Sequence, residues 1–137
     1  MEHGGEHLPA ELVILRTSLR AGEEGAWMNS RGRTSGVIGL KPMPDGKLKT
    51  VRRDLPAFVA QALAKVYAKS RLLRGCPDLV IWHVGSQRVR FVEVKCLHKD
   101  RPSSQQIEFM RVAVLGGVPT EVVEWEFVGT GMKQPHV

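Results

Sequence analysis

Residues 78–95, DLVIWHVGSQRVRFVEVK, decide the fold, because they predict two β-strands joined by a tight turn. Both halves are rich in β-branched and aromatic residues, which favour strands, and Gly85-Ser86 lies between them. If Gly85-Ser86 is a two-residue turn, the pairing runs outward from it until Asp78 lies directly opposite Glu93. The sequence therefore predicts a hairpin with two acidic residues at its open end.

The open end of this hairpin has the composition of a metal site. Directly opposed residues share a face of the sheet, and Lys95 shares that face because it follows Glu93 by two positions. The rest of the hairpin is largely apolar on both faces, so we expect it to be central and buried. Two buried carboxylates repel each other, so a cation should lie between them. Mg²⁺ or Mn²⁺ is expected because both accept oxygen ligands.

These three charged residues suit phosphodiester hydrolysis. A divalent ion held by Asp78 and Glu93 would polarise the phosphodiester and lower the pKa of a bound water. The ammonium of Lys95 would orient that water or stabilise the developing negative charge. The alternative is an ion pair between Lys95 and either acid that only stabilises the end of the sheet.

Helical patterns flank the hairpin on both sides. Apolar residues recur at helical spacing over about 9–21, over 54–70 with Asp54 as the N-cap, and from Ser103 to the glycines at 116–117. In the last segment Ile107, Met110 and Val114 lie along one stripe. The sequence therefore predicts three helices, of which the second is inserted between strands.

Two further strands are predicted outside the hairpin, over residues 26–29 and 121–128. Residues 30–39 are glycine-rich and polar, which predicts a loop, and prolines with Asp45-Gly46 predict a turn over 42–46. The order helix, strand, inserted helix, strand, strand, helix, strand implies an α/β fold with a central mixed β-sheet flanked by helices.

Length and composition predict one soluble domain. The chain has 137 residues, of which 42% are hydrophobic and 25% charged. We expect the domain to span 9–128, between a flexible N-terminus over 1–8 and a C-terminal tail over 129–137. No apolar run approaches the roughly 18 residues that span a membrane, and residues 1–7 lack the pattern of a signal peptide. An intracellular, cytoplasmic protein is therefore expected.

The positive charge of the chain is concentrated in one segment. The net charge is +6, and residues 41–75 hold nine basic residues against Asp45 and Asp54. Such a segment, which includes the inserted helix, can bind nucleic-acid phosphates, although a solvated surface with no ligand is the alternative. The candidate nucleic-acid-binding residues are Lys41, Lys47, Lys49, Arg52, Arg53, Lys65, Lys69, Arg71 and Arg74.

The motifs around the hairpin resemble those of a nuclease family. Gly75-Cys76-Pro77-Asp78 followed by Glu93-Val94-Lys95 resembles the PD-(D/E)xK signature of restriction-endonuclease-like nucleases. Together with Arg-Pro-Ser-Ser-Gln-Gln at 101–106 and the glycines at 116–117, it resembles the VRR-NUC family. The resemblance covers residues 75–126 well and 9–31 loosely. It implies a restriction-endonuclease-like core, here with an inserted basic helix between residues 29 and 75.

The resemblance also implies roles for the residues at the hairpin. Asp78 and Glu93 would be metal ligands, the carbonyl of Val94 would be a third, and Lys95 would be catalytic. Gln106 would be a supporting catalytic residue on the following helix. Ser103-x-x-Gln106 also matches a helix capping box, so Gln106 has a structural alternative.

In this family an additional acid usually comes from the first helix. Glu11 is the best match for that metal ligand, and Glu6 is the other candidate. The alternative for Glu11 is a favourable charge in the first turn of a helix.

These implications predict a Mg²⁺- or Mn²⁺-dependent endonuclease that hydrolyses DNA phosphodiester bonds. By resemblance, its substrate would be branched DNA such as a Holliday junction, its process DNA repair, recombination or phage replication, and its assembly a homodimer. Three alternatives stay open: a DNA-binding module of the same fold that does not cut, a sequence-specific restriction or transposon nuclease, and a partner-binding protein with an acidic ion-pair cluster.

Overall fold

The computed structural model describes residues 2–3, 6–7, 10–29, 36–45, 47–70, 77–96, 101, 103–128 and 131–132. Half of the expected flexible N-terminus and most of the expected C-terminal tail lie outside these ranges. In the described parts, β1 (Glu2–His3) pairs antiparallel with β2 (Glu6–His7), and β10 (Gly131–Met132) pairs antiparallel with β9 (Phe127–Val128) at the end of the expected domain.

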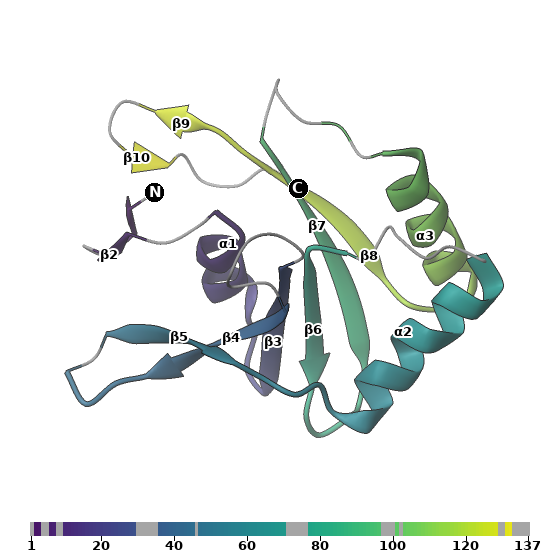
Figure 1. Cartoon of the computed structure of the whole chain (residues 1–137), viewed down its shortest axis with the longest axis horizontal. Helices are drawn as coiled ribbons and strands as arrows, with labels where there is room; N and C mark the ends of the chain where they lie inside the picture. Colours follow the sequence, from purple (N-terminus) through teal and green to yellow (C-terminus); the bar gives the residue numbers. More distant parts are fainter. Residues whose placement is uncertain are drawn as a thin grey trace.

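The centre of the molecule is one six-stranded mixed sheet with the order β5-β4-β3-β6-β7-β8 (Figure 1). Its strands are β3 (Glu23–Asn29), β4 (Gly36–Pro42), β5 (Leu48–Arg52), β6 (Leu79–His83), β7 (Val89–Cys96) and β8 (Thr120–Trp125). Neighbouring strands are antiparallel except for β7 and β8, which are parallel. The predicted α/β class with a mixed sheet is confirmed, and the architecture is restriction-endonuclease-like.

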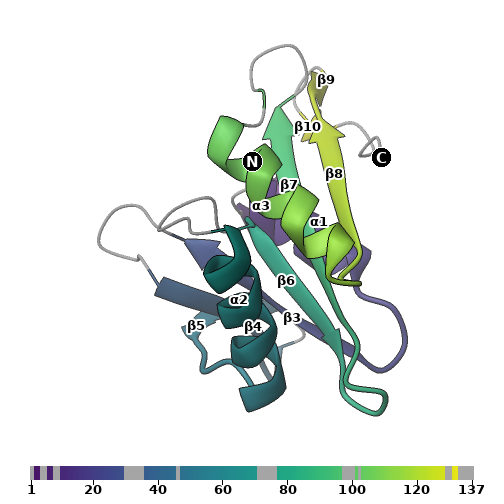
Figure 2. The ribbon, with the colours of Figure 1, turned by 90° about the vertical axis from the view of Figure 1, so that its right-hand side faces the viewer.

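Helices cover both faces of this sheet. α1 (Ala10–Ser18) buries its apolar residues against the face that holds Leu79, Ile81 and Val92. α2 (Ala57–Ser70) and α3 (Ser104–Leu115) lie side by side on the opposite face, in front of the sheet in Figure 2, over the cluster around Trp82 and Phe91. Because side chains alternate along each strand, β6 and β7 supply both cores. The predicted central and buried hairpin is confirmed.

The β6–β7 hairpin has the predicted register but not the predicted turn. Val80 pairs with Phe91 and Trp82 with Val89, as a turn centred on Gly85-Ser86 requires. The turn is longer than two residues, because the last closing contacts are His83 N–H to Arg88 O at 2.9 Å and Gln87 N–H to His83 O at 2.9 Å. Gln87 adopts the left-handed conformation with φ 58°. A longer loop with the same centre preserves the pairing of the strands.

The insertion between β3 and β6 is more structured than the sequence predicts. The predicted loop over 30–39 is wrong from Gly36 onward, where β4 begins, and β5 was not predicted at all. Glycines and lysines dilute the strand signal in both segments, and pairing between the two strands compensates for it. The predicted turn between them is confirmed by the hydrogen bond from Met43 N–H to Lys47 O at 2.8 Å.

The boundaries of several helices and strands differ from prediction. α2 begins at Ala57 rather than after Asp54, because the carbonyl of Pro56 accepts the first helical hydrogen bonds. On α3 the predicted stripe does not face the core: Ile107 is 54% exposed and Val114 is 56% exposed. The helix instead buries Phe109, Val112 and Ala113, which satisfy helical spacing equally well. α1 ends at Ser18 and β8 ends at Trp125, both earlier than predicted.

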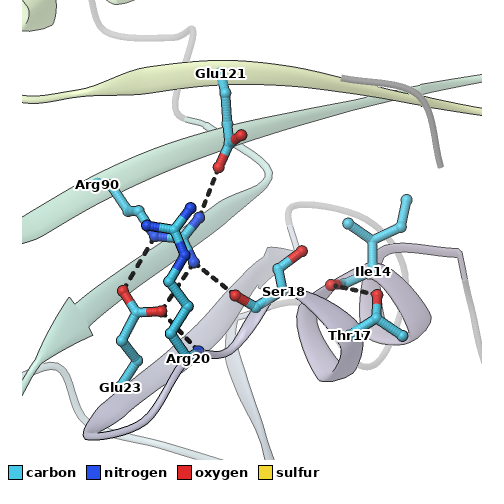
Figure 3. Close-up of polar contacts among 7 residues, drawn as sticks. All are labelled: Ile14, Thr17, Ser18, Arg20, Glu23, Arg90 and Glu121. Carbon is cyan, nitrogen blue, oxygen red and sulfur yellow. Dashed lines mark hydrogen bonds and ion pairs between the residues drawn. The ribbon is translucent and has the colours of Figure 1, made fainter.

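A nearly buried arginine joins α1 to three strands at the far end of the sheet (Figure 3). Arg90 of β7 donates to both carboxylate oxygens of Glu23 in β3, at 3.1 and 3.0 Å, and to Glu121 in β8 at 2.6 Å. It also donates to the carbonyl of Ser18 at the end of α1, at 2.7 Å. The Arg90 guanidinium lowers the pKa of Glu23, so this network is charged at neutral pH.

Candidate active site

The candidate site lies at the open end of the β6–β7 hairpin. Asp78 directly precedes β6 and is held by two contacts: its carbonyl accepts Met28 N–H at 2.8 Å, and its Oδ2 accepts Val94 N–H at 2.7 Å. Continuing the ladder by one residue places Asp78 opposite Glu93, as predicted. Strand alternation puts both acids on the sheet face that α2 and α3 cover.

Among the described residues, Glu93 is the one charged residue that is buried, with 1% of its surface exposed. Its Oε1 accepts a hydrogen bond from Gln106 Nε2 at 2.7 Å and lies 3.3 Å from Lys95 Nζ. Its Oε2 is also buried and receives no hydrogen bond from the described part of the chain. Burial, and then the neighbouring Asp78 carboxyl, raise the pKa of Glu93 to about 9, against the lowering effect of Lys95.

Gln106, at the start of α3, joins the helix to the acidic pair. Its Oε1 accepts hydrogen bonds from Lys95 Nζ at 3.2 Å and from Ser103 N–H at 2.8 Å, while its Nε2 donates to Glu93. The opposite orientation of the amide would place donors against donors, so the network allows only this one. The capping box is also complete, because Ser103 Oγ accepts Gln106 N–H at 3.1 Å. Gln106 thus contacts the predicted site and caps the helix at once.

The oxygen atoms available as ligands at this site fit a hard divalent cation. Asp78 and Glu93 offer carboxylate oxygens, and Glu93 Oε2 is a buried acceptor that lacks a donor. Burying such an oxygen is costly unless a proton or a cation compensates it. A raised pKa means that a proton does so in the metal-free state, and a divalent ion between the two carboxylates would replace that proton.

The structure does not bring the predicted first-helix acid into this cluster. Glu11 is half-buried on α1, which packs on the opposite face of the sheet. Across the described ranges, no three residues among histidine, cysteine, aspartate and glutamate lie close enough to hold one metal. Glu6 belongs to β2, and its side chain is not among those that the structure describes.

The candidate nucleic-acid-binding residues are distributed over the insertion. The side chains of Lys47, Lys49, Arg52, Lys65 and Lys69 are exposed. Arg71, Arg74 and the side chain of Lys41 lie outside the described part of the structure.

Arg53 differs from the other candidates because it turns onto the sheet. Its guanidinium forms an ion pair with Glu24 and lies 4.9 Å above the ring of Trp82. No local sequence pattern predicts this contact, because the three residues are far apart along the chain. Arg53 is therefore part of the scaffold as well as of the basic segment.

A mixed sheet whose central hairpin presents two acids and a lysine at one end defines the restriction-endonuclease-like class of PD-(D/E)xK nucleases. Within that class, the VRR-NUC domain model matches residues 27–125, which is most of the chain, so the protein belongs to the VRR-NUC family of nucleases. The match includes Asp78, Glu93, Lys95 and Gln106 but not α1. Among curated proteins, none matches this chain. No described helix is long and apolar enough to cross a membrane.

Proposed function

We propose that this protein is a metal-dependent endonuclease that hydrolyses DNA phosphodiester bonds with Mg²⁺ or Mn²⁺. The observation that supports it is the buried Glu93 carboxylate, which faces Asp78, contacts Lys95 and has one oxygen without a donor. A structural ion pair would satisfy its own oxygens, whereas a metal site must leave acceptors unsatisfied until the ion binds.

Each residue of the site has a distinct role in this proposal. Asp78 and Glu93 hold the divalent ion, with the Val94 carbonyl as a third ligand. The bound ion supplies a Lewis acid for the scissile phosphate and lowers the pKa of a water. Lys95 donates hydrogen bonds to the phosphate oxygens on which negative charge develops. Gln106 keeps Glu93 and Lys95 in place through its hydrogen bonds to both side chains.

The substrate and assembly that we propose follow from the family. The exposed lysines and arginines of the insertion would bind the DNA backbone by charge rather than read its sequence. Branched DNA is the proposed substrate, with a homodimer placing two sites across a two-fold axis for paired cuts. Glu11 would complete the ligand set only if α1 shifted toward the site when metal binds.

The direct test is cleavage of labelled junction, flap and linear duplex DNA with Mg²⁺ or Mn²⁺. Asp78→Asn and Lys95→Met should each lower the cleavage rate by about a hundredfold or more, because each removes a charge that acts on the transition state. Arg88→Ala, which removes an exposed charge outside the site, should cleave like the wild type. Cleavage that survives both site substitutions would reject the proposed mechanism.

The alternative of a DNA-binding module that does not cut is tested on the same proteins. If the acidic pair holds a metal, Mn²⁺ should raise the Tm of the wild type and should leave the Tm of Asp78→Asn nearly unchanged. DNA binding with neither cleavage nor a metal-dependent Tm would select the non-catalytic module.

A further inference from the structure

The β4–β5 hairpin, residues 36–52, extends beyond the sheet that contains its base, and we call it the arm. β4 pairs with β3 only from Gly36 to Ile38, whereas β4 and β5 continue to pair as far as Pro42 with Leu48. Among the described strands, none therefore lies beside the outer part of the arm except its own two, and Figure 1 shows the arm projecting from the body of the molecule. The pairing of the central strands does not depend on this outer part of the arm.

The base of the arm is fastened to the sheet by Arg53. Its backbone N–H donates to Val37 O at 2.9 Å, and its side chain pairs with Glu24 and covers Trp82. The same side chain fills the space beside Gly39, where an added Cβ would lie only 3.0 Å from Arg53 Cδ. These contacts set the direction in which the arm leaves the sheet.

The arm places like charges opposite each other. In the β4–β5 ladder Lys41 is the direct partner of Lys49. Like charges at directly opposed positions destabilise a ladder, so a protein that keeps such a pair gains something else from it. The side chains of Lys47 and Lys49 are exposed, which leaves them available to an anion.

These lysine positions belong to the same sheet face as the candidate active site. Val37 and Met28 pack into the cluster under α2 and α3, and strand alternation puts positions 39 and 41 on the side of Val37. Val37, Met28 and Asp78 lie in one row across the sheet, because Val37 pairs with Met28 and Met28 N–H donates to Asp78 O. The acids and the lysine positions of the arm therefore share this face, whose central part is covered by α2 and α3.

A hollow lies at the base of the arm. It has a volume of about 440 Å³, and its described lining comes from Val37, Arg52, Arg53 and Asp54. Of its two arginines, Arg53 is paired with Glu24, whereas the side chain of Arg52 is exposed and can contact a phosphate group.

We propose that the arm binds the phosphate backbone of duplex DNA at a distance from the cut, with Lys49 as its principal contact. This inference rests on the proposed function, because it assumes that DNA lies at the acidic pair. The path from Glu93 to Lys41 crosses three strand spacings and then follows β4 for four residues. The two positions are therefore about 20 Å apart, which is about six base pairs of B-form DNA. The substrate is therefore one with a duplex arm of at least that length beside the scissile bond.

The test measures binding in the presence of EDTA, so that cleavage does not enter. Lys49→Ala and Lys49→Glu are compared with Arg88→Ala and Arg88→Glu, which make the same charge changes away from the arm, on a duplex of about 20 base pairs. Each phosphate contact contributes about 0.9 to the slope of log affinity against log salt. Lys49→Ala should reduce that slope by about 0.9 relative to Arg88→Ala, and between 50 and 200 mM salt its affinity should fall about threefold less than that of the wild type.

Thermal stability separates this role from a merely structural one. Lys49→Glu turns a repulsive pair into an attractive one, so its Tm should equal or exceed that of the wild type while its DNA affinity falls. A salt slope equal to that of the Arg88 control would overturn the inference, and so would a lower affinity that is explained by a lower Tm.

A second measurement distinguishes this inference from the proposed function. In cleavage assays the wild type should lose activity when the duplex beside the cut is shorter than about six base pairs, and Lys49→Glu should be less sensitive to that length. Cleavage with no dependence on duplex length rejects the arm but leaves the nuclease intact. Arm-dependent binding without any cleavage rejects the nuclease but leaves the arm.

Discussion

Glu93 has one carboxylate oxygen in contact with Gln106 and Lys95, and a second, buried oxygen that receives no hydrogen bond from the described residues. Its pKa of about 9 means that the metal-free site holds a proton at neutral pH. The ordinary value for a glutamate is near 4.5, so folding moves this group across the physiological range. A metal that binds here must displace the proton, which couples metal affinity to pH.

This shift predicts how stability depends on pH without metal. Between pH 5 and 9 the folded state holds the Glu93 proton and the unfolded state does not, so the free energy of unfolding should fall as pH rises. The slope from one such group is at most about 1.4 kcal/mol per pH unit. Urea denaturation in EDTA across this range should show a steeper fall for the wild type than for Glu93→Gln.

The comparison with Glu93→Gln also removes the contribution of the histidines, which titrate in the same range. Equal slopes in the two proteins would show that Glu93 is ionised in the metal-free state, and would contradict the prediction. Saturating Mn²⁺ should flatten the wild-type slope, because the bound ion takes the place of the proton.

Asp78, Glu93 and Lys95 could be placed together from sequence because a single hairpin register determines their positions. Gln106 was assigned two competing roles, and the structure shows that the capping contact and the contact with Glu93 coexist. The position of Glu11 could not be predicted in the same way. It depends on how α1 packs across the sheet, which no local pattern specifies.

Among the elements, the strands with buried faces were the predictable ones. β6 and β7 are apolar on both sides, so their pattern is strong, while β4 and β5 lie at the edge of the sheet and alternate lysine with apolar residues and glycine. α3 has two apolar stripes, and the sequence alone does not say which one is buried. The stripe through Ile107 and Val114 correctly predicted a helix, but the sequence did not predict whether that stripe is buried or exposed.

Arg53 provides a prediction at the scale of the arm. Arg53→Lys keeps the charge but loses the planar guanidinium, which contacts the ring of Trp82 and pairs with the Glu24 carboxylate. Together these two contacts contribute about 1 kcal/mol to the local stability of the arm at a partly exposed site. Amide hydrogen exchange in β4 and β5 should therefore accelerate about fivefold. Exchange in β6 and β7 is the internal control and should not change. Unaltered exchange in the arm would show that Arg53 does not fasten it.

At the scale of the whole molecule, Arg90 joins α1, β3, β7 and β8 through nearly buried contacts. Its side chain is 11% exposed and that of Glu23 is 10% exposed. Burial opposes the charge of Arg90, but Glu23 and Glu121 raise its pKa overall, so the guanidinium stays protonated. The network therefore holds the sheet together at the end opposite the active site.

Removing this arginine should destabilise the protein strongly. Arg90→Leu removes the charged partner of the nearly buried Glu23, which keeps only the hydrogen bond from Arg20 N–H among its described contacts, and this should lower the free energy of unfolding by about 3–5 kcal/mol. Arg111→Leu breaks an exposed ion pair with Glu108 and should lower the free energy of unfolding far less. Urea denaturation measures both, and the double variant Arg90→Leu/Glu23→Leu should recover part of the loss. Equal effects of the two single substitutions would contradict the prediction.

The position of the insertion has a consequence for how such a nuclease can diversify. β3 and β6 are adjacent strands, with Trp27 paired to Leu79, so the chain leaves the core and re-enters it at neighbouring points. Within that insertion α2 and the base of β4 belong to the core, whereas the outer part of the arm is a surface hairpin, and the entropy of closing a longer hairpin loop rises only slowly with its length. Evolution can therefore lengthen or trim the outer part of the arm while the acids and the lysine keep their positions.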